Sequence, residues 1–125
     1  MGGLILEQER SAIIGAAIEV HKILGPGFLE AVYQEALGLE LAERGIPFEP
    51  QKPLKMRFKQ WTLKKEYVPD FLCFGSVVVE IKAMKALTSQ EQAIALNYLR
   101  ASGFRVCILI NFGSHGKLEF QPIVL

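Results

Sequence analysis

The chain has 125 residues with a formal net charge of +1 at pH 7, and 50% of them are hydrophobic and 22% charged. This composition excludes a disordered chain, and the length suits one domain, residues 1–125, that folds without disulfides or metal. No apolar run reaches the ~20 residues of a membrane span, and the N-terminus lacks the pattern of a secretory signal. Cys73 and Cys107 lie in apolar runs typical of buried thiols, so we expect a cytoplasmic protein.

Two helices are expected in the first part of the chain. Apolar residues at helical spacing predict the first from about Gln8 to Leu24, and Gly25-Pro26-Gly27 then predicts a turn. The second is expected from about Phe28 to Arg44, because Gly45 suits a left-handed C-terminal cap.

The middle of the chain is rich in strand-forming residues. Hydrophobicity alternates along Lys55–Phe58 and Trp61–Tyr67, which predicts two antiparallel strands joined by a short turn. Two further strands are expected at Val68–Phe74 and Ser76–Ala83, which contain many β-branched and aromatic residues and are separated by Gly75.

The last part predicts a helix and two strands. The helix runs from Ser89 to Ala101, with Thr88 or Ser89 as its N-cap and Gly103 at its end. Phe104–Asn111 is typical of a buried central strand, and Leu118–Val124 of an edge strand. The order of these elements predicts an α/β fold, in which helices pack against a mixed β-sheet.

Three charged residues of this predicted sheet could form a site. Glu80 and Lys82 share one face of their strand, roughly 7 Å apart, since a strand rises about 3.3 Å per residue. Asp70 could lie beside Glu80 if the register of the preceding strand allows. Two carboxylates suit a hard cation such as Mg²⁺, which activates water, and a lysine can stabilise charge on a phosphoryl group. The alternative is a simple charge pair at a strand end.

Five short motifs follow one another along the chain. They are Gly27-Phe28-Leu29-Glu30-Ala31-Val32-Tyr33, Pro69-Asp70, Glu80-Ile81-Lys82, Asn97-Tyr98-Leu99-Arg100-Ala101 and Leu109-Ile110-Asn111-Phe112-Gly113. In their order they resemble the GxxExxY family, a branch of the PD-(D/E)XK nuclease superfamily, over nearly the whole chain up to Gly113. The resemblance implies a restriction-endonuclease-like core, and a nuclease that hydrolyses phosphodiester bonds in DNA, with RNA as the alternative.

The resemblance also assigns roles to individual residues. It implies that Asp70 and Glu80 are ligands of Mg²⁺ or Mn²⁺, that Lys82 is the catalytic lysine, and that Glu30 is an acidic residue supplied by the helix before the sheet. Tyr33 shares a helix face with Glu30 and is expected to support it. Alternatively, Glu30 complements the helix dipole and Tyr33 is a core residue.

One position departs from the pattern of the family. Relatives expected to be active carry Gln three residues before the Asn-Tyr-Leu triplet, where this chain has Ile94. Gln90 and Glu91 lie on roughly the same helix face, so either could substitute. Otherwise the site is weakened, and the domain is a module that binds nucleic acid or a protein partner.

A basic strip between residues 52 and 65 is the clearest feature of the charge distribution. It could neutralise phosphates, or it could be a solvated hairpin face whose lysines prevent strand pairing. Trp61 could stack on a base or pack within the hairpin. Because duplex-cutting enzymes often act as symmetric pairs, we also expect a homodimer. The basic residues are Lys52, Lys55, Arg57, Lys59, Lys64 and Lys65.

Overall fold

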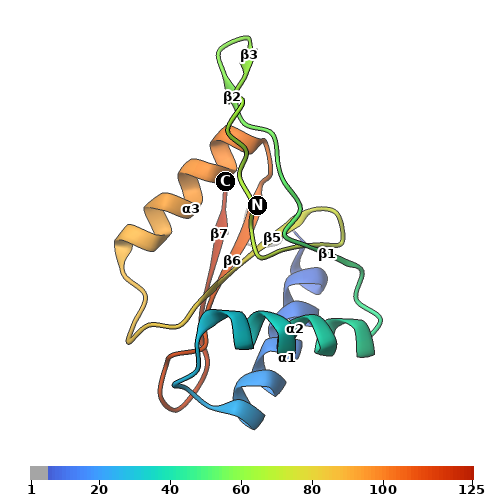
Figure 1. Ribbon diagram of the computed structural model, residues 1–125, viewed down its shortest axis with the longest axis vertical. Helices are drawn as coiled ribbons and strands as arrows, with labels where there is room; N and C mark the ends of the chain where they lie inside the picture. Colours follow the sequence, from blue (N-terminus) through green and yellow to red (C-terminus); the bar gives the residue numbers. More distant parts are fainter. Residues whose placement is uncertain (1–5) are drawn as a thin grey trace.

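The structure is a computed structural model that describes residues 6–125 (Figure 1). The helices are α1 (Glu7–Leu24), α2 (Glu30–Glu43) and α3 (Ser89–Ser102). The strands are β1 (Phe48–Pro50), β2 (Arg57–Phe58), β3 (Trp61–Thr62), β4 (Phe71–Cys73), β5 (Val77–Lys82), β6 (Val106–Asn111) and β7 (Glu119–Val124). Within this described part, no helix is long and apolar enough to cross a membrane.

Five of the strands form a central mixed sheet in the order β1-β4-β5-β6-β7. Strands β5 and β6 are parallel, and α3 connects them, whereas the other neighbouring strands are antiparallel. Helices α1 and α2 pack on one side of this sheet, and α3 lies on the other (Figure 1). The predicted α/β fold, a mixed sheet flanked by helices, is confirmed and agrees with a restriction-endonuclease-like core.

Strand β5 is buried on both faces, with side chains that alternate as predicted. Val77, Val79 and Ile81 belong to the core beneath α1 and α2. Val78 belongs to the second core, beneath α3. Glu80 and Lys82 share the face of Val78, and both are only partly buried. The α3 side of the sheet therefore becomes polar and accessible toward the end of β5.

The elements between residues 46 and 74 differ from the prediction. Strand β1 was not predicted, because three residues ending in Pro50 show no clear alternation. Strands β2 and β3 are only two residues long and form a separate two-stranded sheet, so the predicted strands 55–58 and 61–67 were too long. The flanking segments meet again at a hydrogen bond from the Leu63 N–H to the Met56 carbonyl and at the isolated Leu54–Tyr67 bridge. This hairpin projects beyond the body of the protein (Figure 1).

The helix boundaries lie within a few residues of the prediction. Helix α2 begins at Glu30 rather than Phe28. Helix α3 starts with a capping box, in which the Thr88 side chain accepts from the Glu91 N–H and the Glu91 side chain accepts from the Thr88 N–H. Its C-cap is Gly103, whose φ of +83° is the left-handed conformation that glycine adopts easily.

Candidate functional site

Asp70 and Glu80 lie next to each other on the neighbouring strands β4 and β5. The register pairs Phe71 with Val79, so Asp70 stands one step further, opposite Glu80. The Ile81 N–H donates to Asp70 Oδ2 over 2.7 Å, and the Asp70 N–H donates to Glu80 Oε1 over 3.2 Å. The expected proximity is therefore confirmed, and each carboxylate is oriented by a backbone N–H group.

Both carboxyl groups ionise less readily than an exposed carboxylate. Burial is the main cause that raises the pKa of Asp70; the Glu30 charge raises it further, while the Ile81 N–H and Lys82 oppose the rise. Burial also raises the pKa of Glu80, and repulsion from Asp70 adds to it. Two such carboxylates repel each other when both are ionised, so a bound cation would offset the repulsion.

Lys82 contributes a positive charge on the same face of β5. Its ammonium group lowers the pKa of both Asp70 and Glu80, which places it within electrostatic reach of the pair. Across residues 6–125, however, no ion pair within 4.0 Å joins Lys82 to a carboxylate. The ammonium group is therefore close to the acidic pair without being committed to either member.

The start of α2 contributes Glu30 to this region but not Tyr33. Glu30 is exposed, and its charge acts on Asp70. Tyr33 is fully buried and stacks on Phe112, with ring centroids 4.7 Å apart. Its hydroxyl donates to the Gly25 carbonyl and accepts from a backbone N–H of the same turn, so it holds the turn before α2. This placement favours the core alternative for Tyr33.

Gln34 is a neighbour of Asp70 that was not predicted from the sequence. Its Nε2 lies 3.5 Å from the Asp70 carbonyl oxygen and donates a long hydrogen bond. Gln34 is one helical turn after Glu30, and residues four apart share a helix face. That spacing could have indicated Gln34 as a neighbour of the site. The GxxExxY motif instead indicated Tyr33, three residues after Glu30.

Tyr67 and Tyr98 also contribute to the site and were not predicted from the sequence. The Tyr67 hydroxyl lies close enough to the Glu80 carboxylate to lower the pKa of Glu80. Burial, followed by the charge of Glu80, raises the pKa of Tyr67, which keeps its hydroxyl protonated. The Tyr67 ring stacks on Tyr98 of α3, with centroids 4.2 Å apart. Tyr98 belongs to the motif Asn97-Tyr98-Leu99-Arg100-Ala101, but nothing in the sequence indicated its contact with Tyr67.

The two residues proposed to replace the missing Gln do not form hydrogen bonds with the acidic pair. The Glu91 carboxylate accepts from the Thr88 N–H and hydroxyl over 2.7 and 2.8 Å, and these contacts lower its pKa. Gln90 is exposed, and its N–H donates to Thr88 Oγ1. Ile94 is 45% exposed. It lines a cavity of about 460 Å³ together with Met56, Asn97, Tyr98 and Ala101.

A buried polar network fixes the segment that follows β5. Asn111 Oδ1 accepts from the Met84 and Gly113 N–H groups over 3.0 and 3.1 Å. Its Nδ2 donates to Glu119 Oε1, which also accepts from the Leu87 N–H. This network anchors the connection between β5 and α3. It therefore holds β5, which carries Glu80, in place relative to α3.

The six residues of the basic strip fall into two groups. Lys52 pairs with Glu49, and Lys55 pairs with Glu66, each over 3.0 Å. The other four are exposed and have no ion pair with any residue between 6 and 125. These four are Arg57, Lys59, Lys64 and Lys65, which lie on or next to the β2–β3 hairpin.

A model of the PD-(D/E)XK nuclease superfamily matches residues 7–123. The chain belongs to this superfamily. Comparisons with curated proteins and with solved structures give no match. The pattern that names the PD-(D/E)XK superfamily corresponds to Pro69-Asp70 and Glu80-Ile81-Lys82, the residues brought together by β4 and β5. Membership in a superfamily of nucleases indicates nuclease activity and a nucleic-acid substrate.

Proposed function

We propose that the protein is a Mg²⁺-dependent nuclease of the GxxExxY branch that hydrolyses phosphodiester bonds in DNA, with RNA as the alternative substrate. The observation that carries this proposal is the hydrogen-bonded Asp70–Glu80 pair, with Lys82 on the same strand face. The match to the superfamily over residues 7–123 supports it.

The donor groups suit Mg²⁺ or Mn²⁺. Both are hard cations that prefer oxygen ligands, and Mg²⁺ keeps several waters in its coordination sphere. In the part of the chain that the structure describes, no cluster of three or more His, Cys, Asp or Glu could hold a metal. Asp70 and Glu80 would therefore hold the ion together with water. When bound, such an ion polarises a phosphoryl oxygen and acidifies water.

The surrounding side chains would position the reactants. The Lys82 ammonium group can donate a hydrogen bond to the attacking water and stabilise negative charge on the phosphoryl oxygens. The water oxygen bonds to phosphorus, the phosphorus–oxygen ester bond breaks, and the leaving oxygen takes up a proton. The Tyr67 hydroxyl lies close to the Glu80 carboxylate and favours its ionised form. Glu30 adds negative charge beside Asp70.

One observation favours a second candidate function. Ile94 presents an apolar side chain where the resemblance to the GxxExxY family implies Gln, and neither Gln90 nor Glu91 makes a hydrogen bond to the acidic pair. The second candidate is a catalytically weakened nuclease-fold module that binds nucleic acid or a protein partner.

Metal titration followed by a cleavage assay separates the two functions. Mg²⁺ and Mn²⁺ are titrated calorimetrically into the wild type, Asp70→Asn and Glu43→Gln, an exposed acidic position at the far end of α2. Each protein is then incubated with single- and double-stranded DNA and RNA. The proposal predicts that Asp70→Asn loses both binding and cleavage while Glu43→Gln keeps them. Nucleic-acid binding without metal binding or cleavage in the wild type would favour the module.

We also propose a cytoplasmic location, supported by the two buried free thiols, Cys73 and Cys107. Burial raises the pKa of Cys73 to about 12. A buried thiol that remains protonated is inert toward oxidation, which agrees with a structural role in a reducing compartment.

A further inference from the structure

The β2–β3 arm, residues 55–65, leaves two large aromatic side chains in water. Phe58 and Trp61 are cross-strand partners, so they project from the same face of the hairpin. They are 56% and 55% exposed, with ring centroids 6.3 Å apart and ring planes inclined by 16°. A two-stranded hairpin is marginally stable alone, and neither ring is buried in the core. Exposed aromatic pairs of this kind mark binding surfaces.

The same arm carries unneutralised positive charge. Residues 57–65 contain four basic side chains and no acidic one. In the described chain, none of the four forms an ion pair, in contrast to Lys52 and Lys55. Lys59 Nζ lies 5.4 Å from the centroid of the Phe58 ring. Proteins hold single-stranded nucleic acid with two features: aromatic rings on which bases stack, and cationic side chains that contact the phosphates.

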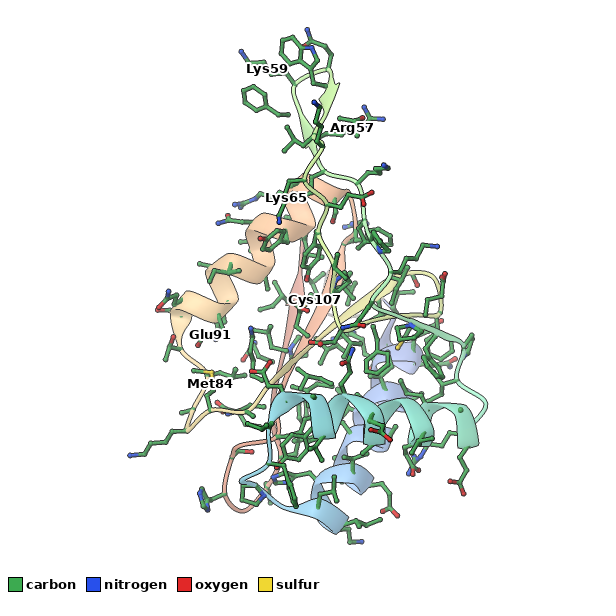
Figure 2. The ribbon with its side chains drawn as sticks, in the orientation of Figure 1. Arg57, Lys59, Lys65, Met84, Glu91 and Cys107 are labelled. Atoms are coloured by element: carbon green, nitrogen blue, oxygen red, sulfur yellow. The ribbon has the colours of Figure 1, made fainter. Side chains whose placement is uncertain are left out.

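The arm is connected structurally to the acidic pair. From β3 the chain returns past Lys65 to Tyr67, whose hydroxyl lies close enough to Glu80 to lower the pKa of that carboxyl group. At the base of the arm, Met56 lines the same cavity as Ile94 and Tyr98, and Tyr98 stacks on Tyr67. Figure 2 shows Lys59 at the tip of the arm and Lys65 further down, beside α3. Cationic and aromatic groups therefore extend from the tip toward the acidic pair.

We propose that the β2–β3 arm binds the unpaired bases of a nucleic-acid strand, which stack on Phe58 and Trp61 while Arg57, Lys59, Lys64 and Lys65 contact its phosphates. The strand then runs along α3 toward Asp70 and Glu80. Paired bases expose only their edges in the grooves of a duplex, so the ring faces of the arm require unpaired bases. The proposal rests on the proposed nuclease function only where it describes the bound strand as the substrate.

Trp61 is the only tryptophan in the chain, so its fluorescence reports directly on this arm. A 15-nucleotide oligothymidylate, the matching oligouridylate and a blunt DNA duplex of equal length are titrated into the full chain with a chelator present. We expect a single strand to quench Trp61 and the duplex to quench it much less. Comparison of the oligothymidylate with the oligouridylate shows whether DNA or RNA is the ligand.

Arm variants then test the contacts. Phe58→Ala should weaken single-strand binding at least about fivefold, the lower end of the loss expected for a stacked aromatic. Replacing Arg57 and Lys59 together with Ala should make the salt dependence shallower, by about 0.7 in log–log slope for each lost contact. The matched controls are Phe120→Ala and Lys22→Ala, which change exposed residues on β7 and α1. Circular dichroism confirms that each variant is folded.

Equal quenching by duplex and single strand would overturn the proposal. The same conclusion follows if binding is detected by anisotropy of a labelled oligonucleotide but leaves Trp61 unquenched. A blue shift with phosphatidylserine vesicles, without any response to oligonucleotides, would instead identify the arm as a membrane-binding element. Quenching without cleavage in Mg²⁺ supports the arm and contradicts the nuclease, whereas cleavage without quenching does the reverse.

Discussion

Asp70 is held in an environment that disfavours its charge. Burial of its carboxyl group and the nearby charge of Glu30 raise the pKa of Asp70, and the Ile81 N–H and Lys82 oppose this rise only in part. Folding must therefore overcome the cost of ionising Asp70 at neutral pH. A group with this property is suited to receive a cation, since the cation offsets the same repulsion that opposes folding.

This environment predicts that Asp70→Asn stabilises the metal-free protein at pH 7, because Asn can still accept the Ile81 N–H bond without the charge. A raised folded-state pKa means that ionisation is disfavoured in the folded state, so the wild type should gain stability as the pH falls through that pKa toward ordinary carboxyl values near 4. The variant should gain less. Thermal unfolding by circular dichroism between pH 4 and 8, with a chelator, measures the difference, at about 3–5 °C for each kcal/mol.

Addition of Mg²⁺ should reverse this ranking. Binding to the folded state alone raises the melting temperature of the wild type, and a hundredfold excess over the Kd corresponds to about 2.7 kcal/mol. Asp70→Asn should not respond, and Glu43→Gln should respond as the wild type does. A wild type that melts at the same temperature with and without Mg²⁺ would contradict the proposed metal site.

We predict that the Tyr67→Phe variant shifts the pH dependence of cleavage. The variant loses the hydroxyl that lowers the pKa of Glu80, so this pKa should rise further. The acid limb of the kcat/KM profile should move to higher pH, because Glu80 must be ionised to hold a cation. Tyr98→Phe keeps the ring stack on Tyr67 and serves as the control. An unchanged acid limb in Tyr67→Phe would mean that the Tyr67 hydroxyl has no influence on the activity.

The proximity of Asp70 and Glu80 could be predicted because Gly75 indicated a short connection between two strands. The contacts of Tyr67 and Gln34 could not, because each depends on how a side chain from a distant segment meets the β4–β5 pair. Tyr33 illustrates the same limit. Its spacing from Glu30 was correct for a shared helix face, yet the packing of Phe112 draws the ring into the core.

At the level of elements, the connection after β5 depends on close backbone contact. A Cβ added to Gly113 would lie 2.5 Å from both the nitrogen and the oxygen of Met84. Backbone atoms cannot move aside as a flexible side chain can. The turn after β6 therefore packs directly on the segment after β5, beside the Asn111 network.

Gly113→Ala should therefore destabilise the protein by about 1–3 kcal/mol, the usual cost of overpacking. Gly38→Ala is the matched control, because its Cβ would meet Phe71 at an ordinary 3.6 Å. Gly38 lies within α2, where alanine is favoured over glycine by about 1 kcal/mol. Urea unfolding should show opposite signs for the two variants. Equal stability of Gly113→Ala and wild type would mean that this turn relaxes easily.

Helices were predicted closely because their ends carry strong local signals, such as Gly25-Pro26-Gly27 before α2 and Gly103 after α3. The strands between residues 46 and 74 were predicted less well. The alternation of hydrophobic and polar residues along 61–67 continues beyond Thr62, where β3 ends. Tyr67 is buried, but it pairs with Leu54 through an isolated bridge and not as part of a continuous strand. Short edge strands such as β1 are specified by their neighbours rather than by their own residues.

At the level of the whole molecule, both edges of the sheet resist further pairing. Strand β1 ends with Pro50, and β7 contains Pro122, neither of which has an N–H to donate. Proline at an edge strand prevents another strand from adding to the sheet. The homodimer that the sequence led us to expect for duplex cleavage would therefore form through helices or loops instead of a continuous sheet.

Light scattering at micromolar concentration, with and without duplex DNA, tests this dimer. We expect twice the monomer mass, 13.9 kDa for each chain. Because the expected interface avoids the sheet edges, Val124→Pro, which removes an N–H group of β7 that faces away from β6, should leave the dimer intact if the protein remains folded. A monomeric mass under both conditions would remove the dimer from the proposal.

The exposed position of Trp61 also affects how the folding of this protein is observed. The indole sits on the projecting arm, whereas the two cores surround the central sheet. Its emission therefore reports whether the hairpin is closed, and a two-stranded hairpin can open at denaturant concentrations that leave the rest intact. Fluorescence and circular dichroism would then give different unfolding midpoints. That difference would reflect local opening of one segment and would not by itself indicate a folding intermediate.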